Sequence, residues 1–159
     1  MMRKAISVDK DKCIGCFACV VACKLEHNLP PHPVKPPIGN PEGPKPIRII
    51  EVGPKVQNGE VVEHYFKAIV CNHCVVPPCI EECPNSAIYI GEDDIILVDK
   101  DKCDGCKVCL EVCPYEAPQF DSDNKLVLCD LCIQRLGEGK KPICVTVCVA
   151  EAISITKPN

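Results

Sequence analysis

Sixteen cysteines fall into four groups of four along a chain of 159 residues, and this grouping constrains the fold more than any other feature. Groups one and three share the spacing C-x2-C-x2-C-x3-C, and the last two cysteines of groups two and four keep the same x3 interval. No cysteine is left over. The four groups are Cys13, Cys16, Cys19 and Cys23; Cys71, Cys74, Cys79 and Cys83; Cys103, Cys106, Cys109 and Cys113; and Cys129, Cys132, Cys144 and Cys148.

One cysteine-bearing phrase occurs twice. VDKDKCIGC occupies residues 8–16, and VDKDKCDGC occupies residues 98–106. Short β-branched runs flank the groups, and the residues after the third cysteine of groups one and three favour one or two turns of helix. The sequence therefore predicts an internal repeat of strand, cysteine loop, short helix and strand. The predicted strands are AISVD, AIYI, IILVD and AISIT, with the first pairing the last and the second pairing the third.

Residues 29–67 interrupt this repeat. The segment begins with a proline-rich run that excludes both helix and central strand, so we expect an extended excursion over the surface. IRIIEV and EVVEHYFKAIV follow, separated by a segment that contains Asn58-Gly59, a strong turn dipeptide. This part predicts a β-hairpin. Tyr65 and Phe66 are expected in the core, with an interface position as the alternative.

Composition limits the possible function. The chain has no Trp, three Phe, three Tyr and two Met, so it needs something besides large side chains to fill its interior, and bound metal can supply that folding free energy. A net charge of -4 without a basic stripe argues against nucleic acid as a partner. The sequence shows neither a secretory signal nor an apolar run of membrane-spanning length, which predicts a cytoplasmic protein. Thiols stay reduced there, which favours metal binding over disulfides.

The cysteine spacing indicates iron–sulfur clusters. Three cysteines within seven residues can wrap one cluster, and Gly15 and Gly105 between the first two ligands allow unusual backbone dihedrals. In two-cluster bacterial ferredoxins the fourth cysteine ligates the other cluster and precedes proline, as Cys83 and Cys113 do here. Zinc suits only group four taken alone, and the C-x2-C-H of haem attachment is absent. Clusters with four thiolate ligands have no open coordination site, so we expect electron transfer and no catalytic residues.

The run IVCNHCVVPPCIEECP, residues 69–84, resembles the signature of the four-cluster ferredoxin-like subunits of molybdenum and tungsten oxidoreductases. The resemblance covers all four cysteine groups in order. It implies an α+β fold of two pseudo-symmetric ferredoxin-like modules, each of the bacterial 2[4Fe–4S] type, with short antiparallel strands and short helices. An outer module would comprise residues 1–28 and 120–159, and an inner module residues 68–119, with residues 29–67 inserted between them.

The resemblance also implies how sixteen cysteines ligate four [4Fe–4S] clusters. Each cluster takes three thiolates from one group and the fourth from another. Cluster 1 would be held by Cys13, Cys16, Cys19 and Cys148; cluster 2 by Cys23, Cys129, Cys132 and Cys144; cluster 3 by Cys71, Cys74, Cys79 and Cys113; and cluster 4 by Cys83, Cys103, Cys106 and Cys109.

The predicted function is electron transfer between a molybdenum- or tungsten-pterin catalytic subunit and a second carrier, such as a flavin subunit or a ferredoxin. One alternative is an electron-transfer subunit of a hydrogenase or carbon monoxide dehydrogenase, and another is a free polyferredoxin. Outside this class, the alternative is a metal-binding structural module without redox activity.

His73 lies between two ligands and is expected to form a hydrogen bond, to contact a partner or to serve a purely structural role. The lysines near the loops are expected on the solvated surface. They are Lys10, Lys12, Lys24, Lys100, Lys102 and Lys107.

Overall fold

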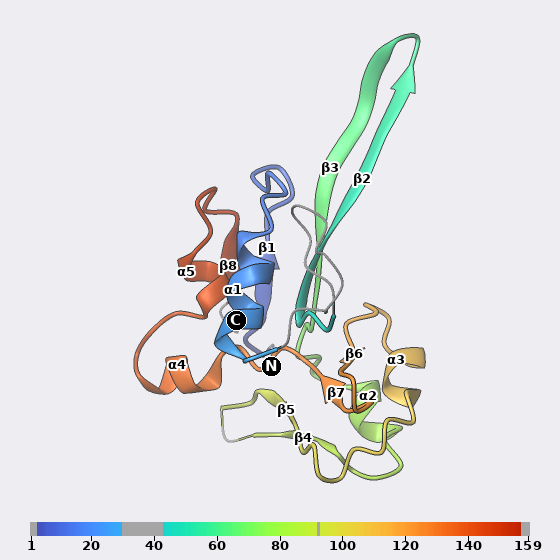
Figure 1. Cartoon of the computed structure of the whole chain (residues 1–159), viewed down its shortest axis with the longest axis vertical. Coiled ribbons are helices and arrows are strands. Elements are labelled where there is room, and N and C mark those ends of the chain that lie inside the picture. The colour runs from blue at the N-terminus through green and yellow to red at the C-terminus, as the bar shows by residue number, and fades with distance from the viewer. Residues whose placement is uncertain (1–2, 30–42, 92, 157–159) are drawn as a thin grey trace.

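The chain folds into four two-stranded antiparallel sheets and five helices within the part that the structure describes, residues 3–29, 43–91 and 93–156 of a computed structural model (Figure 1). Among these described residues, none of the helices has the length and hydropathy of a membrane-spanning segment. The strands are β1 (Ile6–Val8), β2 (Ile47–Gln57), β3 (Glu60–Val70), β4 (Ile88–Ile90), β5 (Ile96–Val98), β6 (Gln119–Phe120), β7 (Leu126–Val127) and β8 (Ile153–Ile155). The helices are α1 (Ala18–Glu26), α2 (Pro78–Glu81), α3 (Val108–Glu111), α4 (Ile133–Gly137) and α5 (Ile143–Thr146).

The two ends of the chain build one half of the molecule. Strand β1 pairs with β8 in antiparallel register, with Ile6 opposite Ile155 and Val8 opposite Ile153. Helices α1 and α5 pack against each other beside this sheet (Figure 1). The predicted pairing of AISVD with AISIT is confirmed, and it brings the first and last cysteine groups together.

The middle of the chain builds the other half in the same way. Strand β4 pairs with β5, with Ile88 opposite Val98, and helix α2 contacts α3. The predicted pairing of AIYI with IILVD is confirmed. Strands β6 and β7 form a further small sheet that the sequence did not indicate, and Leu126 of β7 packs into the core of this half. The division into modules at 1–28 with 120–159, 29–67 and 68–119 stays a prediction, and β6–β7 straddles its boundary at residue 119.

The hairpin of β2 and β3 projects away from both halves (Figure 1). Asn58 and Gly59 at its tip both have positive φ, which fits a two-residue type I′ turn and confirms the predicted turn dipeptide. Strand β2 runs past the expected end at Val52, and its register with β3 shifts where Gly53-Pro54 lies. Proline is tolerated there because a two-stranded sheet has only edge strands. Most of the proline-rich excursion, residues 30–42, lies outside the described residues.

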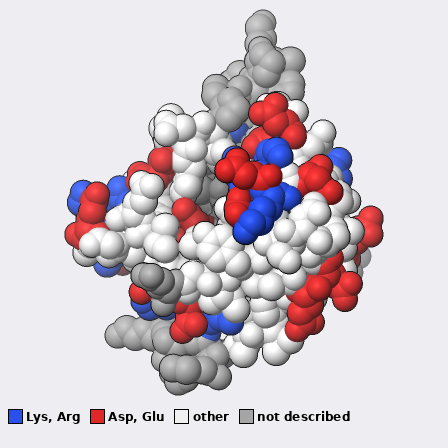
Figure 2. Space-filling model, turned by 90° about the horizontal axis from the view of Figure 1, so that it is seen from below, with Lys and Arg blue, Asp and Glu red and all other residues white. Residues whose placement is uncertain are grey.

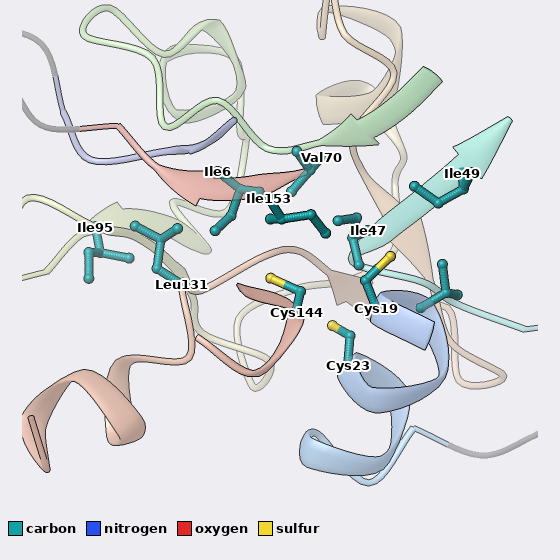
Figure 3. Close-up of a cluster of buried hydrophobic side chains, with 11 residues drawn as sticks. Ile6, Cys19, Cys23, Ile47, Ile49, Val70, Ile95, Leu131, Cys144 and Ile153 are labelled. Carbon is teal, nitrogen blue, oxygen red and sulfur yellow. The ribbon is translucent and has the colours of Figure 1, made fainter. Parts of the chain in front are cut away.

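Cysteines form part of the main core. The buried cluster drawn in Figure 3 combines aliphatic side chains from both ends of the chain, from the base of the hairpin and from the middle of the chain with three thiols. Ile95 comes from the middle of the chain, so the two halves share this core. The labelled members are Ile6, Cys19, Cys23, Ile47, Ile49, Val70, Ile95, Leu131, Cys144 and Ile153.

The two aromatic residues of β3 take different positions. Phe66 is half-buried and packs against the main core, as expected. Tyr65 is also half-buried, but it lies beneath the ammonium group of Lys10, whose Nζ is 5.4 Å from the ring centroid. Tyr65 therefore lies at the rim of the core.

Candidate metal centre

The four cysteine loops share one local design. In each group the third cysteine is the second residue of a short helix. In the twin loops of groups one and three, Gly15 and Gly105 have φ of 67° and 77°, and Phe17 and Lys107 have φ of 58° and 65°. The backbone therefore follows the same path at both copies of the repeated phrase. The prediction that glycine serves an unusual dihedral here is confirmed.

The fourth cysteine lies within a helix in only one of the four groups. Cys23 lies within α1, but Cys83, Cys113 and Cys148 lie just beyond the ends of α2, α3 and α5. Proline follows Cys83 and Cys113, and a residue before proline is disfavoured in helical conformation, so those helices end early. Cys148 has no such proline. The backbone amides of Ala87 and Ala152 donate to the Sγ atoms of Cys83 and Cys148 at 3.3 Å, four residues on in each case.

In the outer half, thiols from both ends of the chain approach one another. The pKa of Cys19 rises to about 12, first through burial and then through the neighbouring thiolates of Cys16, Cys13 and Cys148. A small cavity lies between these four thiols and is otherwise lined by apolar side chains. Sulfur from residue 148 therefore faces the loop that begins at residue 13.

A second set of thiols forms beside the first. Burial raises the pKa of Cys144 to about 12, with further contributions from Cys23, Cys132 and Cys19. Burial also raises the pKa of Cys129 well above its usual range, with contributions from Cys23, Cys71 and Cys144.

The middle of the chain holds two further sets. The pKa of Cys71 rises to about 12, first through burial and then through the neighbouring thiolates of Cys79, Cys74 and Cys113. For Cys109 the pKa again rises to about 12, first through burial and then through the neighbouring thiolates. Those neighbours are Cys79, Cys106, Cys103 and Cys83.

The four sets lie in a row. Three thiol pairs connect one set to the next: Cys19 with Cys144, Cys129 with Cys71, and Cys79 with Cys109. The order is therefore the Cys13 set, the Cys129 set, the Cys71 set and the Cys103 set.

Each set suits a cationic iron–sulfur core. Buried thiolates this close to one another repel, and burial favours their neutral form, so a positive core is needed to hold them ionised. Four sulfur donors per set match the ligand number of a [4Fe–4S] cluster. Such a core supplies reversible one-electron chemistry when bound, and the chain supplies four thiolates, amide donors and a dry surrounding.

An ion pair that the sequence did not reveal connects the two ends of the chain in the outer half of the molecule. His27 Nε2 lies 2.9 Å from Asp130 Oδ1, and its Nδ1 lies 2.8 Å from the carbonyl oxygen of Cys23. The same Asp130 oxygen accepts the amide of Cys132 at 2.8 Å. The hydrogen bond to Asp130 raises the pKa of His27 far above its ordinary value. Burial acts to raise the pKa of Asp130, but the bond with His27 holds it below its usual range. His27 and Asp130 are 103 residues apart in the sequence, and their ion pair connects the first and the last cysteine groups. Such a contact is visible only in the tertiary structure.

The lysines near the loops divide into two kinds. Five are exposed, as expected. The prediction that Lys24 lies on the surface is wrong. Lys24 is 4% exposed, and its Nζ donates a hydrogen bond to the carbonyl oxygen of Pro44 at 3.2 Å. Burial lowers the pKa of Lys24, and the segment entering β2 covers it.

Known proteins match this chain over most of its length. Residues 12–87 and 62–157 each match a family described as a 4Fe–4S dicluster domain. The B component of anaerobic dimethyl sulfoxide reductase from Escherichia coli (strain K12) is 37% identical over 153 residues, which cover 92% of this chain and 69% of the relative. The B component of sulfite dehydrogenase from Allochromatium vinosum is 39% identical over 167 residues, or 96% of this chain and 68% of the relative.

The name of a third relative states electron transfer as that protein's role. The thiosulfate reductase electron transfer subunit PhsB of Salmonella typhi is 33% identical over 150 residues, which cover 91% of this chain and 71% of the relative. The two matched family regions account for four clusters, and sixteen cysteines supply four ligands to each. The chain therefore belongs to the 4Fe–4S dicluster family of electron-transfer subunits of oxidoreductases, and it holds four [4Fe–4S] clusters in a ferredoxin-like α+β fold.

Proposed function

We propose that this chain carries electrons between a molybdenum- or tungsten-pterin catalytic subunit and a second, separate electron carrier. Relatives named as components of dimethyl sulfoxide reductase and sulfite dehydrogenase support a catalytic subunit of this kind. The cytoplasm stays the predicted location, because thiols remain reduced there.

We assign the ligands as the resemblance implies, and the proximity of the thiols supports each set. Cluster 1 takes Cys13, Cys16, Cys19 and Cys148; cluster 2 takes Cys23, Cys129, Cys132 and Cys144; cluster 3 takes Cys71, Cys74, Cys79 and Cys113; and cluster 4 takes Cys83, Cys103, Cys106 and Cys109. In this assignment the clusters follow one another in numerical order through the molecule.

The exposure of the cysteines carries the proposal. All sixteen lie within the described residues, and among them only Cys16 and Cys106 are exposed. These two belong to clusters 1 and 4, the two ends of the row. A row of redox centres with a solvent-exposed ligand at each end can accept electrons from one partner and pass them to another.

Deletion of this chain from the native complex tests the proposal. We expect turnover with the natural electron acceptor or donor to be lost, because the route between the two partners is broken. Turnover with an artificial dye that reacts at the catalytic subunit should persist. If the complex without this chain kept its natural turnover, the proposal would be wrong. If the complex failed to assemble, a variant lacking cluster 1 alone replaces the deletion in the same assay.

The two ends differ in surface chemistry. Ile14, Val21 and Val149 lie near cluster 1 in sequence and are 61%, 44% and 78% exposed. Exposed apolar side chains are typical of a permanent interface, so we propose that this end faces the catalytic subunit.

The middle of the chain, which carries the cysteine loop of cluster 4, is acidic. Residues 68–119 contain ten Asp and Glu against three Lys, whereas residues 1–28 and 120–159 contain eight acidic and ten basic side chains. Figure 2 shows the face on the side of β4 and β5, with acidic groups gathered along one edge. We propose that a carrier with a basic surface docks at the cluster 4 end through long-range attraction.

Asp101 and Asp11 offer a matched test of this polarity, because they occupy the same position in the two repeated loops and both are exposed. We expect Asp101→Lys to slow electron exchange of the complex with cytochrome c, a basic redox protein, by about threefold or more at low salt. Asp11→Lys should leave that rate and its salt dependence unchanged. Stopped-flow kinetics at several ionic strengths measure both. Equal effects of the two substitutions would contradict the proposed polarity.

A further inference from the structure

His73 contains a buried polar atom without a partner in the part of the chain that the structure describes. The residue lies in the loop between Cys71 and Cys74, is 1% exposed and has a φ of 46°. Its backbone amide donates to Cys71 Sγ at 3.4 Å. Its ring Nδ1 accepts the amide of Ile96 at 3.0 Å, whereas Nε2 has no hydrogen-bond partner there.

These contacts define the tautomer. A nitrogen that accepts an amide hydrogen carries no proton of its own, so in the neutral ring the proton is on Nε2. A buried N–H without an acceptor is destabilising, and native proteins almost always provide one. An acceptor for Nε2–H is therefore expected.

The ring lies where the two halves of the molecule meet. Ile96 belongs to β5 of the inner half, and the nearby charged groups that act on the ring are Asp130, which follows Cys129 of the outer half, and Arg3. Ile95 and Leu131 pack in the same core at this seam (Figure 3). Cys71 and Cys129, the ligands assigned to clusters 3 and 2, approach each other here. His73 is therefore in contact with a sulfur ligand assigned to cluster 3, at the place where that ligand approaches one assigned to cluster 2.

We propose that His73 Nε2–H donates a hydrogen bond to a sulfur atom of one of the two central clusters, at the junction between the outer and inner halves. The inference rests on the ligand sets assigned under the proposed function. A hydrogen bond to cluster sulfur stabilises the more negative, reduced state and so raises the reduction potential. His73 would favour reduction of one central cluster, at the step where electrons pass from one half to the other.

Pulsed electron paramagnetic resonance of the reduced holo-protein, labelled with ring-¹⁵N histidine, tests the hydrogen bond itself. We expect a ¹⁵N coupling to a reduced cluster that disappears in His73→Asn. The control is His27→Asn, since His27 Nδ1 lies 3.7 Å from Cys23 Sγ and is the competing source of such a coupling. Persistence of the coupling in His27→Asn supports the proposal. A wild-type protein without coupling, or coupling that His27→Asn alone abolishes, overturns it and indicates a buried water as the acceptor.

Redox titration gives a second readout. Asn keeps an acceptor for the Ile96 amide but removes the donor at Nε2, whereas Gln extends an amide donor toward the same position. We expect the ratio of reduced to oxidised cluster at fixed potential to fall several-fold for one central cluster in His73→Asn, with partial recovery in His73→Gln. Unchanged ratios for all clusters overturn the proposal. Both readouts require only that the wild type holds four reducible clusters, so they are separate from the test of the partners. If His73→Asn fails to load iron, the labelled wild type and His27→Asn still decide.

Discussion

The double variant Cys71→Ser/Cys113→Ser should lose no more iron than either single variant. We propose that both thiols ligate cluster 3, so either substitution removes the same cluster, about four irons per chain. Cys71→Ser/Cys83→Ser should lose about twice as much, although these two cysteines belong to one sequence group. Effects at one shared centre are not additive, whereas effects at separate centres are. Iron and sulfide analysis of the purified holo-protein measures the difference.

The matched control comes from the outer half. Cys19→Ser/Cys148→Ser should behave like a single loss, and Cys19→Ser/Cys23→Ser like a double loss. Redox titration guards against a serine that keeps a cluster partly bound, because each single variant should change the potential of one cluster only. Additive iron loss in Cys71→Ser/Cys113→Ser would contradict the crossed ligand sets and favour clusters built within each sequence group.

Gly105→Ala should destabilise the holo-protein by about 3 kcal/mol or more. A non-glycine residue in the left-handed region costs about 1–2 kcal/mol, and the added Cβ would also collide with the backbone oxygen of Asn124 in the turn between β6 and β7. Gly139→Ala is the control: its φ of +73° matches the +77° of Gly105, but no atom lies within 4 Å of the added Cβ. It should cost only the conformational part, about 1–2 kcal/mol.

Anaerobic denaturant titration, followed by visible absorbance and far-ultraviolet circular dichroism, measures both variants. Visible absorbance should be lost at lower denaturant in Gly105→Ala, because the loop that carries cluster 4 must shift. Equal midpoints for the two variants would show that the approach of Asn124 does not constrain this loop.

Much of the fold was predictable because its signals are local. The strands around each cysteine group are short β-branched runs, and Asn58-Gly59 specifies its own turn. The lengths of helices were harder to predict, since proline after Cys83 and Cys113 ends α2 and α3 within one turn. Strands β6 and β7 were missed because two residues each are too short for any periodic signal.

In the metal centre, too, the features that depend on local sequence were predictable and those that depend on distant contacts were not. The cysteine spacing predicted the cluster-binding loops, because one loop of a few residues contains three ligands whose relative positions do not depend on the rest of the chain. His27 and Asp130 were missed, since their contact spans 103 residues and neither has a distinctive neighbourhood in the sequence. Lys24 was misplaced on the surface because a covering segment, not its own helix, decides its burial.

The sequence by itself determined the chemistry of this protein: sixteen thiols in loops that suit four [4Fe–4S] clusters, repeated so that each half mirrors the other. Ligation within a loop is a short-range property, and the cysteine spacing records it. The tertiary structure alone decided which distant thiols face each loop, which two cysteines are exposed, and why His73 keeps one N–H buried at the seam. Those properties depend on long-range packing, in which residues far apart in the chain, such as His27 and Asp130, share one environment.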